Sequence, residues 1–160
     1  MHLHLPDEAA TRALGAALAS AIGPGIVIFL SGDLGAGKTT FVRGLIRALG
    51  YAGKVKSPTF SLVEPYVLSR LNLYHFDLYR IKSVAEWDDS GFREYFGGDA
   101  VCLVEWPEKA LGMLPPEDLR VRFVVHDSGR DVTIEATTEL GDRCRQQLLE
   151  ILPSNIARIA

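Results

Sequence analysis

The chain has 160 residues, 48% of them apolar, so it can bury a substantial core, and we expect residues 1–160 to form a single domain. A net charge of −3 argues against autonomous binding to nucleic acid, although a local basic face within a larger assembly stays open. Cys102 and Cys144 stand far apart with no Cys or His pair nearby, which argues against a disulfide framework or a cysteine metal site. No signal-peptide pattern and no apolar run of membrane-spanning length is present, so we expect a soluble, cytoplasmic protein without a membrane partner.

The first elements expected along the chain are a helix, a buried strand and a second helix. Residues 6–22 carry acidic residues in the first turn and an apolar stripe behind them, which predicts an amphipathic helix. Residues 26–30 are continuously apolar, as expected of a strand that is buried on both faces. From Phe41 to Leu49 apolar residues recur at helical spacing.

Between that strand and the second helix, residues 32–39 read GDLGAGKT and match G-x-x-x-x-G-K-[ST] without a mismatch. Glycines allow successive backbone N–H groups to converge on an anion, and the N-terminus of the following helix adds a partial positive charge. Lys38 supplies a charge for the β- and γ-phosphates, and Thr39 offers a hydroxyl to Mg²⁺. The flanking strand and helix disfavour a mere glycine-rich turn, so the motif predicts a nucleoside triphosphate site.

The rest of the chain predicts two hairpins around a second buried strand. The expected elements are strands at 60–67 and 71–78, one or two short helices within 84–96, a strand at 101–105, strands at 119–126 and 131–137, and a helix at 140–152. Arg130 is expected at the tip of the second hairpin. His75 is interpreted as a core histidine rather than a catalyst, and Arg80 and Arg93 as surface residues rather than γ-phosphate contacts.

Two acids stand at strand ends, where α/β proteins gather their ligands, and the one that closes the apolar run 101–105 fits the Walker B pattern of P-loop proteins. These are Asp77 and Glu105. One of them should hold Mg²⁺, directly or through water, and the other should position water or respond to the presence of the metal. The residues alone do not assign the two roles. Ser57-Pro58-Thr59 is either a loop that contacts the γ-phosphate or Mg²⁺, or a polar connecting turn, and both interpretations stay open. Because no N-K-x-D segment is present to read guanine, adenine is the favoured base.

With these motifs the chain resembles the TsaE family, the ATPase component of the bacterial machinery that makes threonylcarbamoyladenosine at position 37 of tRNA. Besides the phosphate loop, the resemblance rests on segments 5–11 (LPDEAAT), 56–66 (KSPTFSLVEPY), 74–80 (YHFDLYR) and 104–108 (VEWPE). It implies an α/β fold, a P-loop NTPase-like three-layer sandwich with a mixed, partly antiparallel sheet. It also implies that the Ser57-Pro58-Thr59 loop acts as a switch.

The same resemblance implies a set of site residues. ATP would be bound by Thr11, Gly35, Ala36, Gly37, Lys38, Thr39, Thr40 and Arg130, with Thr11 and Arg130 near the base. Mg²⁺ would be held by Thr39 and Glu105, and the catalytic residues would be Lys38, Asp77 and Glu105. The implied partner is the TsaD–TsaB heterodimer, which ATP binding and hydrolysis would reset between turnovers, with tRNA reached only through that complex.

The favoured hypothesis is therefore a partner-dependent ATPase that is required for threonylcarbamoylation of tRNA. A small-molecule P-loop kinase is the alternative and would need an acceptor cleft beside the γ-phosphate. A nucleotide-binding scaffold without relevant turnover is the third possibility, and it would tolerate the loss of Glu105.

Overall fold

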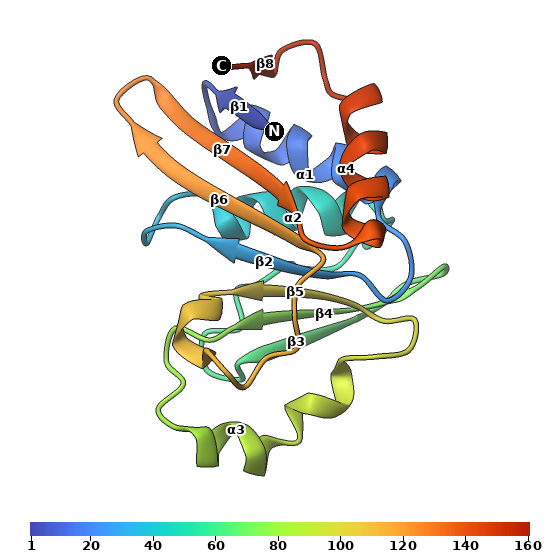
Figure 1. Ribbon diagram of the computed structural model, residues 1–160, viewed down its shortest axis with the longest axis vertical. Helices are drawn as coiled ribbons and strands as arrows, with labels where there is room; N and C mark the ends of the chain where they lie inside the picture. Colours follow the sequence, from blue (N-terminus) through green and yellow to red (C-terminus); the bar gives the residue numbers. More distant parts are fainter.

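The computed structural model describes residues 1–160 and contains an eight-stranded mixed sheet flanked by helices (Figure 1). The strand order is β3-β4-β5-β2-β6-β7-β1-β8. The strands are β1 (His2–Leu5), β2 (Val27–Ser31), β3 (Val63–Val67), β4 (Asn72–Asp77), β5 (Val101–Glu105), β6 (Leu119–His126), β7 (Gly129–Ala136) and β8 (Ala157–Arg158). The helices are α1 (Glu8–Ala21), α2 (Lys38–Ala48), α3 (Val84–Ser90) and α4 (Glu139–Glu150), with short 3-10 turns η1 (Phe92–Tyr95) and η2 (Pro107–Ala110).

The middle of the sheet is parallel and its two sides are antiparallel. Strands β4, β5, β2 and β6 pair in parallel, whereas β3 joins β4, and β7 joins both β6 and β1, in the antiparallel sense. Every residue of β5 is buried, as the apolar run predicted for a strand covered on both faces. Because parallel strands end at the same edge, the segments that follow β2, β4 and β5 meet there.

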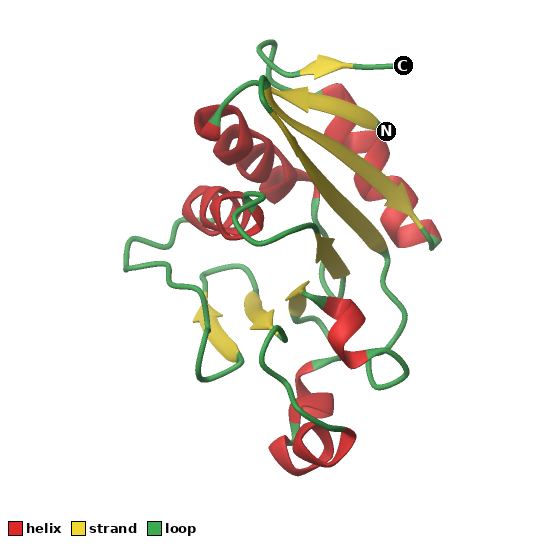
Figure 2. Cartoon of the chain, turned by 90° about the vertical axis from the view of Figure 1, so that its left-hand side faces the viewer, coloured by secondary structure: helices red, strands yellow, loops and turns green.

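Helical layers cover both faces, which confirms the predicted three-layer α/β architecture. The larger core holds 28 buried residues and joins the sheet to α1, α2 and α4. A second core of nine buried residues lies on the other face, where Trp87 of α3 and Phe92 of η1 pack against Phe76 of β4. Figure 2 shows α1 and α2 together beside the strands, with α3 well apart from them. Trp87 and both cysteines are buried in these cores.

Two expectations about the strands were wrong, and two short strands were not expected at all. The chain does not become extended at Phe60, whose side chain is 86% exposed, because residues 59–62 form a turn. In that turn the N–H of Leu62 donates to Pro58 O at 3.1 Å, so the backbone is already paired before β3 begins. Strands β1 and β8 were not expected, since such short segments owe their conformation to pairing with partners far along the chain. Arg130 lies within β7, opposite Leu5, rather than at a solvated tip.

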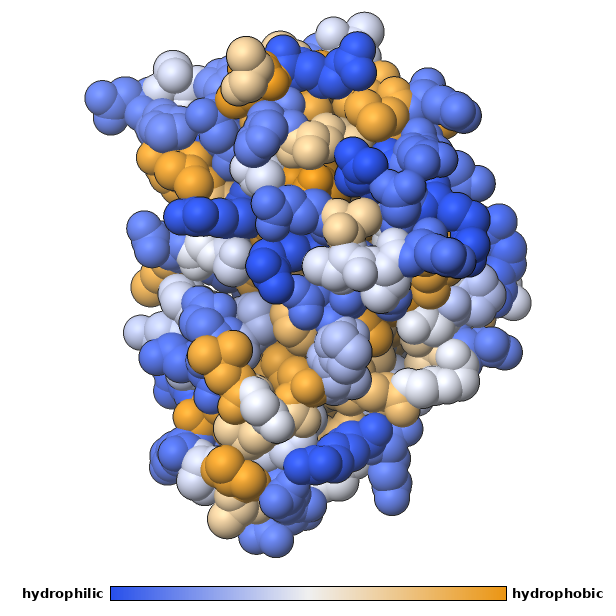
Figure 3. Space-filling model, in the orientation of Figure 1, coloured by the Kyte–Doolittle hydropathy of each residue, from blue (hydrophilic) through white to orange (hydrophobic).

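The surface carries no extended apolar face in the orientation of Figure 3, where hydrophobic side chains are interspersed with polar ones and gather most in the lower part. None of the helices combines the length and the hydropathy that crossing a membrane would need.

Candidate functional site

The phosphate loop joins the end of β2 to the start of α2 and adopts the backbone that its glycines predict. Gly32, Gly35 and Gly37 have φ values of 141°, 79° and 106°, a region that favours glycine. At Gly37 a Cβ atom would also lie 2.1 Å from the guanidinium of Arg130, so a side chain has no room there. Gly37 caps α2 without a side-chain hydrogen bond, which leaves the first N–H groups of the helix for an anion.

Lys38 is held against the loop that precedes it. Its Nζ donates to the carbonyls of Gly32 at 2.5 Å and Asp33 at 3.0 Å, and lies 4.2 Å from the ring centre of Trp106. The side chain is only 4% exposed, and this burial lowers the pKa of the ammonium, an effect that Glu105 and other nearby carboxylates oppose. Trp106 has a φ of 58°, an uncommon conformation for a bulky residue directly after the strand end.

Glu105 ends β5 and links three elements of the site. Its Oε1 accepts a hydrogen bond from the hydroxyl of Thr39 on α2 at 3.0 Å and lies 2.9 Å from Nε2 of His75 on β4. The Glu105 side chain is 3% exposed. The register pairs Asp77 with Glu105, so the two acids predicted from separate strand ends stand side by side.

Asp77 is bonded to the segment that precedes β3. Its Oδ2 accepts a hydrogen bond from the Ser57 hydroxyl at 3.0 Å, and its Oδ1 accepts the backbone N–H of Tyr79 at 3.0 Å. The N–H of Asp77 donates to the carbonyl of Leu62 at 2.9 Å. The segment 57–62, which begins with the Ser57-Pro58-Thr59 loop, is therefore bonded at both of its ends to Asp77, in keeping with either interpretation of the loop.

These groups line one cleft of about 340 Å³. Its wall consists of Leu34, Gly35, Ala36, Gly37, Lys38, Thr39, Thr40, Ser57, Thr59, Asp77, Tyr79, Arg80, Glu105 and Trp106. Arg80 was interpreted as a surface residue; it is exposed, but it lies on the cleft wall with its guanidinium 5.1 Å from the ring centre of Phe60. Arg93 pairs with Asp88 outside the cleft, as a surface arginine would.

Thr11 and Arg130 lie behind the phosphate loop rather than on the wall of the cleft. Arg130 Nη1 donates to the carbonyl of Ala36 at 3.0 Å. Thr11 is fully buried, and its hydroxyl donates to Asp7 O at 3.0 Å within α1. A Cβ on Gly37 would lie 3.4 Å from the Thr11 methyl, so both residues contact the same turn of the loop.

His75 is the site residue whose importance sequence reasoning missed. It was expected in the core, and it is fully buried, but its ring contacts the carboxylate of Glu105. Strand alternation already indicated that His75 and Asp77 share a face of β4, and this was the available signal.

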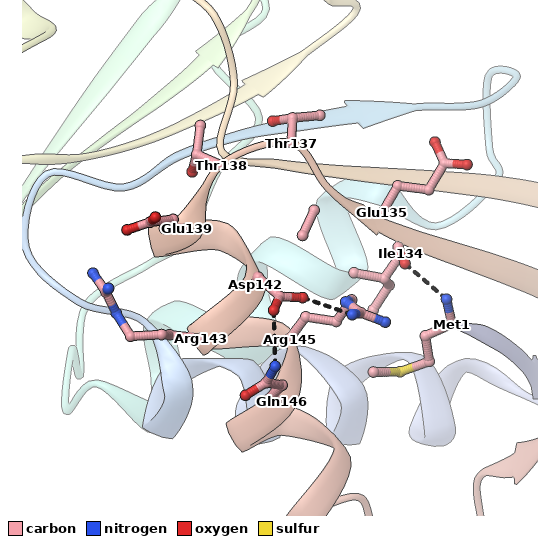
Figure 4. Close-up of a pocket in the computed structure, with 11 residues that line it drawn as sticks. Met1, Ile134, Glu135, Thr137, Thr138, Glu139, Asp142, Arg143, Arg145 and Gln146 are labelled. Carbon is pink, nitrogen blue, oxygen red and sulfur yellow. Dashed lines mark hydrogen bonds and ion pairs between the residues drawn. The ribbon is translucent and has the colours of Figure 1, made fainter.

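A larger, open hollow of about 890 Å³ lies between β7 and α4 and shares no lining residue with the cleft (Figure 4). Some of its polar groups are paired locally: Asp142 accepts hydrogen bonds from Arg145 and Gln146, and the Met1 ammonium donates to Ile134 O (Figure 4). We therefore treat the cleft at the phosphate loop as the candidate site.

The residues of the cleft fit a magnesium nucleotide. The chain has no cluster of three His, Cys, Asp or Glu side chains that could hold a metal by themselves. Mg²⁺ in nucleotide sites needs no such cluster, because it is bound through one or two protein oxygens together with phosphate oxygens. The adjacent hydroxyl of Thr39 and carboxylate of Glu105 are oxygen ligands of that kind. Fold and cleft together define a P-loop NTPase-like protein.

Comparison with known proteins identifies the family. The family model described as threonylcarbamoyl adenosine biosynthesis protein TsaE matches residues 5–132, so the chain belongs to the TsaE family. Relatives named tRNA threonylcarbamoyladenosine biosynthesis protein TsaE are 41% identical in Haemophilus influenzae, over 86% of this chain and 90% of the relative, and 42% identical in Bacillus subtilis, over 86% and 84%. The crystal structure of YdiB from Bacillus subtilis superposes with a TM-score of 0.81 at 33% identity and covers 94% of each chain.

Proposed function

We propose that this chain binds ATP with Mg²⁺ and hydrolyses it as an accessory subunit for the threonylcarbamoylation of adenosine 37 in tRNA. Its relatives in the TsaE family are named as proteins of tRNA threonylcarbamoyladenosine biosynthesis. The observation that carries the proposal is the contact of Glu105 with Thr39 beside an uncapped helix N-terminus, since these are the positions for a magnesium ion and a triphosphate.

Within this proposal each site residue has a distinct task. The N–H groups of residues 35–40 would bind the phosphates, and Lys38 would exchange its loop carbonyls for phosphate oxygens. Thr39 and Glu105 would hold Mg²⁺, which supplies charge neutralisation for the transferring phosphoryl group. Asp77, whose carboxylate already bonds to Ser57, would orient water or transmit the state of the nucleotide to the loop. Thr11 and Arg130 would support the loop on the side of the base.

The proposed partner is the TsaD–TsaB heterodimer, with tRNA reached only through that complex and the cytoplasm as the compartment. The exposed Leu34 lies within the phosphate loop, and the exposed Phe60 directly follows the Ser57-Pro58-Thr59 loop. A docked protein could therefore sense the state of both loops, which supports a nucleotide-driven reset of the partner.

The proposal is tested by reconstituting tRNA modification with purified TsaD–TsaB and the threonylcarbamoyl donor, with and without this chain. We expect slow hydrolysis by the chain alone, faster hydrolysis with the partners, and multiple rounds of modification only when the chain and ATP are both present. Glu105→Ala should abolish the repeated turnover. If the partners change neither hydrolysis nor modification, the proposed function is wrong. A phosphorylated metabolite would instead favour the hypothesis of a small-molecule kinase. Full activity of Glu105→Ala would favour a nucleotide-binding scaffold.

A further inference from the structure

His75 has one hydrogen-bond partner, and that partner is the proposed metal ligand. The side chain is fully buried on β4, two residues before Asp77. Its Nε2 lies 2.9 Å from Oε1 of Glu105, the same oxygen that accepts the Thr39 hydroxyl. Its other nitrogen, Nδ1, is buried without a partner.

We propose that His75 is a positioning residue that donates its Nε2–H to Glu105 and thereby fixes the carboxylate for Mg²⁺. The inference rests on the proposed nucleotide site. Both hydrogen bonds fall on Oε1, from two different elements, so the carboxyl group is held in one orientation and Oε2 is left for the metal or its water. Groups that orient a metal ligand in this way affect metal affinity about 10- to 100-fold when they are removed.

The position of the proton follows from the chemistry of the two groups. A carboxylate that binds Mg²⁺ is ionised and can only accept, so within the proposed site the contact at 2.9 Å requires the hydrogen on Nε2 of His75. A neutral imidazole then carries no hydrogen on Nδ1, which is left as a buried acceptor without a partner. A histidine that merely filled space would need neither this tautomer nor this contact.

Two substitutions separate the hydrogen bond from the volume of the side chain. His75→Gln can present an amide N–H at the position of Nε2, whereas His75→Asn is shorter and reaches only the region of Nδ1. The affinity of each variant for a fluorescent ATP analogue is measured in excess EDTA and in excess Mg²⁺. The ratio of the two affinities reports how strongly the metal supports nucleotide binding, and urea unfolding of the apo chains reports stability separately.

We expect His75→Asn to lower this ratio about tenfold or more, with little change in EDTA, and His75→Gln to stay within about threefold of the unsubstituted chain. The inference is overturned if both variants keep the original ratio, or if both lose it equally. If the unsubstituted chain itself binds no nucleotide, or gains nothing from Mg²⁺, the proposed function fails instead.

A second measurement needs no substitution and so does not depend on the folding of a variant. In the nitrogen NMR spectrum of chain with isotope-labelled histidine, we expect the His75 ring to show the Nε2–H tautomer and a slowly exchanging proton. An Nδ1–H tautomer could not donate to Glu105 and would contradict the inference.

Discussion

At the scale of single residues, Lys38 supplies the positive charge of the proposed phosphate site. Its ammonium is removed from water and bonded to two carbonyls of the loop, with the face of Trp106 alongside. Burial lowers its pKa, and the nearby carboxylates act in the opposite direction. Phosphate oxygens offer the cation stronger, charge-assisted partners than these carbonyls do.

Replacing Lys38 by Ala should therefore weaken nucleotide binding. A charge-assisted hydrogen bond is worth about 1.5–3 kcal/mol, which corresponds to a loss of about 10- to 150-fold in affinity. Titration calorimetry with ATP and Mg²⁺ measures the change. Lys82→Ala is the matched control, since Lys82 is exposed and does not line the cleft; undiminished affinity in Lys38→Ala would exclude this phosphate site.

At the scale of elements, the position of the phosphate loop depends on the close approach of α1 and α2. A Cβ on Gly15 would lie 2.1 Å from the carbonyl oxygen of Phe41, and one on Gly44 would lie 2.2 Å from that of Arg12. The two helices thus touch backbone to backbone. Since α2 begins at Lys38, this contact also sets where the helix N-terminus points.

The substitution Gly15→Ala should force the helices apart. Overpacking of this kind costs about 1–3 kcal/mol of unfolding free energy. Urea unfolding measures it, and Gly23→Ala is the control because its added Cβ would meet only Leu140 Cδ1 at 3.7 Å. Equal stability of the two variants would mean that α1 and α2 can move apart without a cost in unfolding free energy.

The strands behind the loop are linked by Asp131, which lies next to Arg130. One carboxylate oxygen lies 2.8 Å from His4 Nδ1 on β1, and the other lies 3.0 Å from His126 Nε2 on β6. These contacts hold the pKa of Asp131 below its ordinary value of 3.8, and the hydrogen bond with His4 is the largest cause.

A carboxyl group whose pKa is lowered in the folded state stabilises the fold above its unfolded pKa and loses that effect as the pH falls through the folded value. Asp131→Asn should therefore lower the urea midpoint at pH 5–6, and the difference from the unsubstituted chain should close below about pH 4. Asp127→Asn, an exposed position in the neighbouring turn, serves as the control. A difference that did not change with pH would assign the effect to packing.

At the scale of the whole molecule, the parallel centre of the sheet assembles the site from distant segments. The phosphate loop follows β2, while Asp77 and Glu105 end β4 and β5. A ligand that contacts all three is bound by the folded chain and not by the unfolded one, so binding must add to global stability.

Saturating ATP with Mg²⁺ should accordingly raise the melting temperature. At a ligand concentration about 100 times Kd the gain is about 2.7 kcal/mol, or about 5–10 °C for a chain of this size. Differential scanning fluorimetry measures it, with Lys38→Ala expected to remove most of the shift and EDTA to reduce it. An unchanged melting temperature in the presence of the nucleotide would contradict the proposed ligand.

The local parts of this structure could be predicted from the sequence by itself. The glycine loop, the helix that follows Lys38 and the buried strand that ends at Glu105 depend on backbone freedom, periodicity and capping, which act between neighbours in the chain. The meeting of Asp77 and Glu105 could also be anticipated, because the ends of parallel strands share an edge.

The tertiary structure alone decided contacts between residues that neither propensity nor spacing relates. It set the pairing of β1 and β8 and the place of Arg130 behind Ala36. It also placed His75, which was expected only to pack in the core, in contact with Glu105. A hydrogen bond between side chains on separate strands depends on register and orientation to within about an ångström, and those are determined only when the whole sheet has assembled.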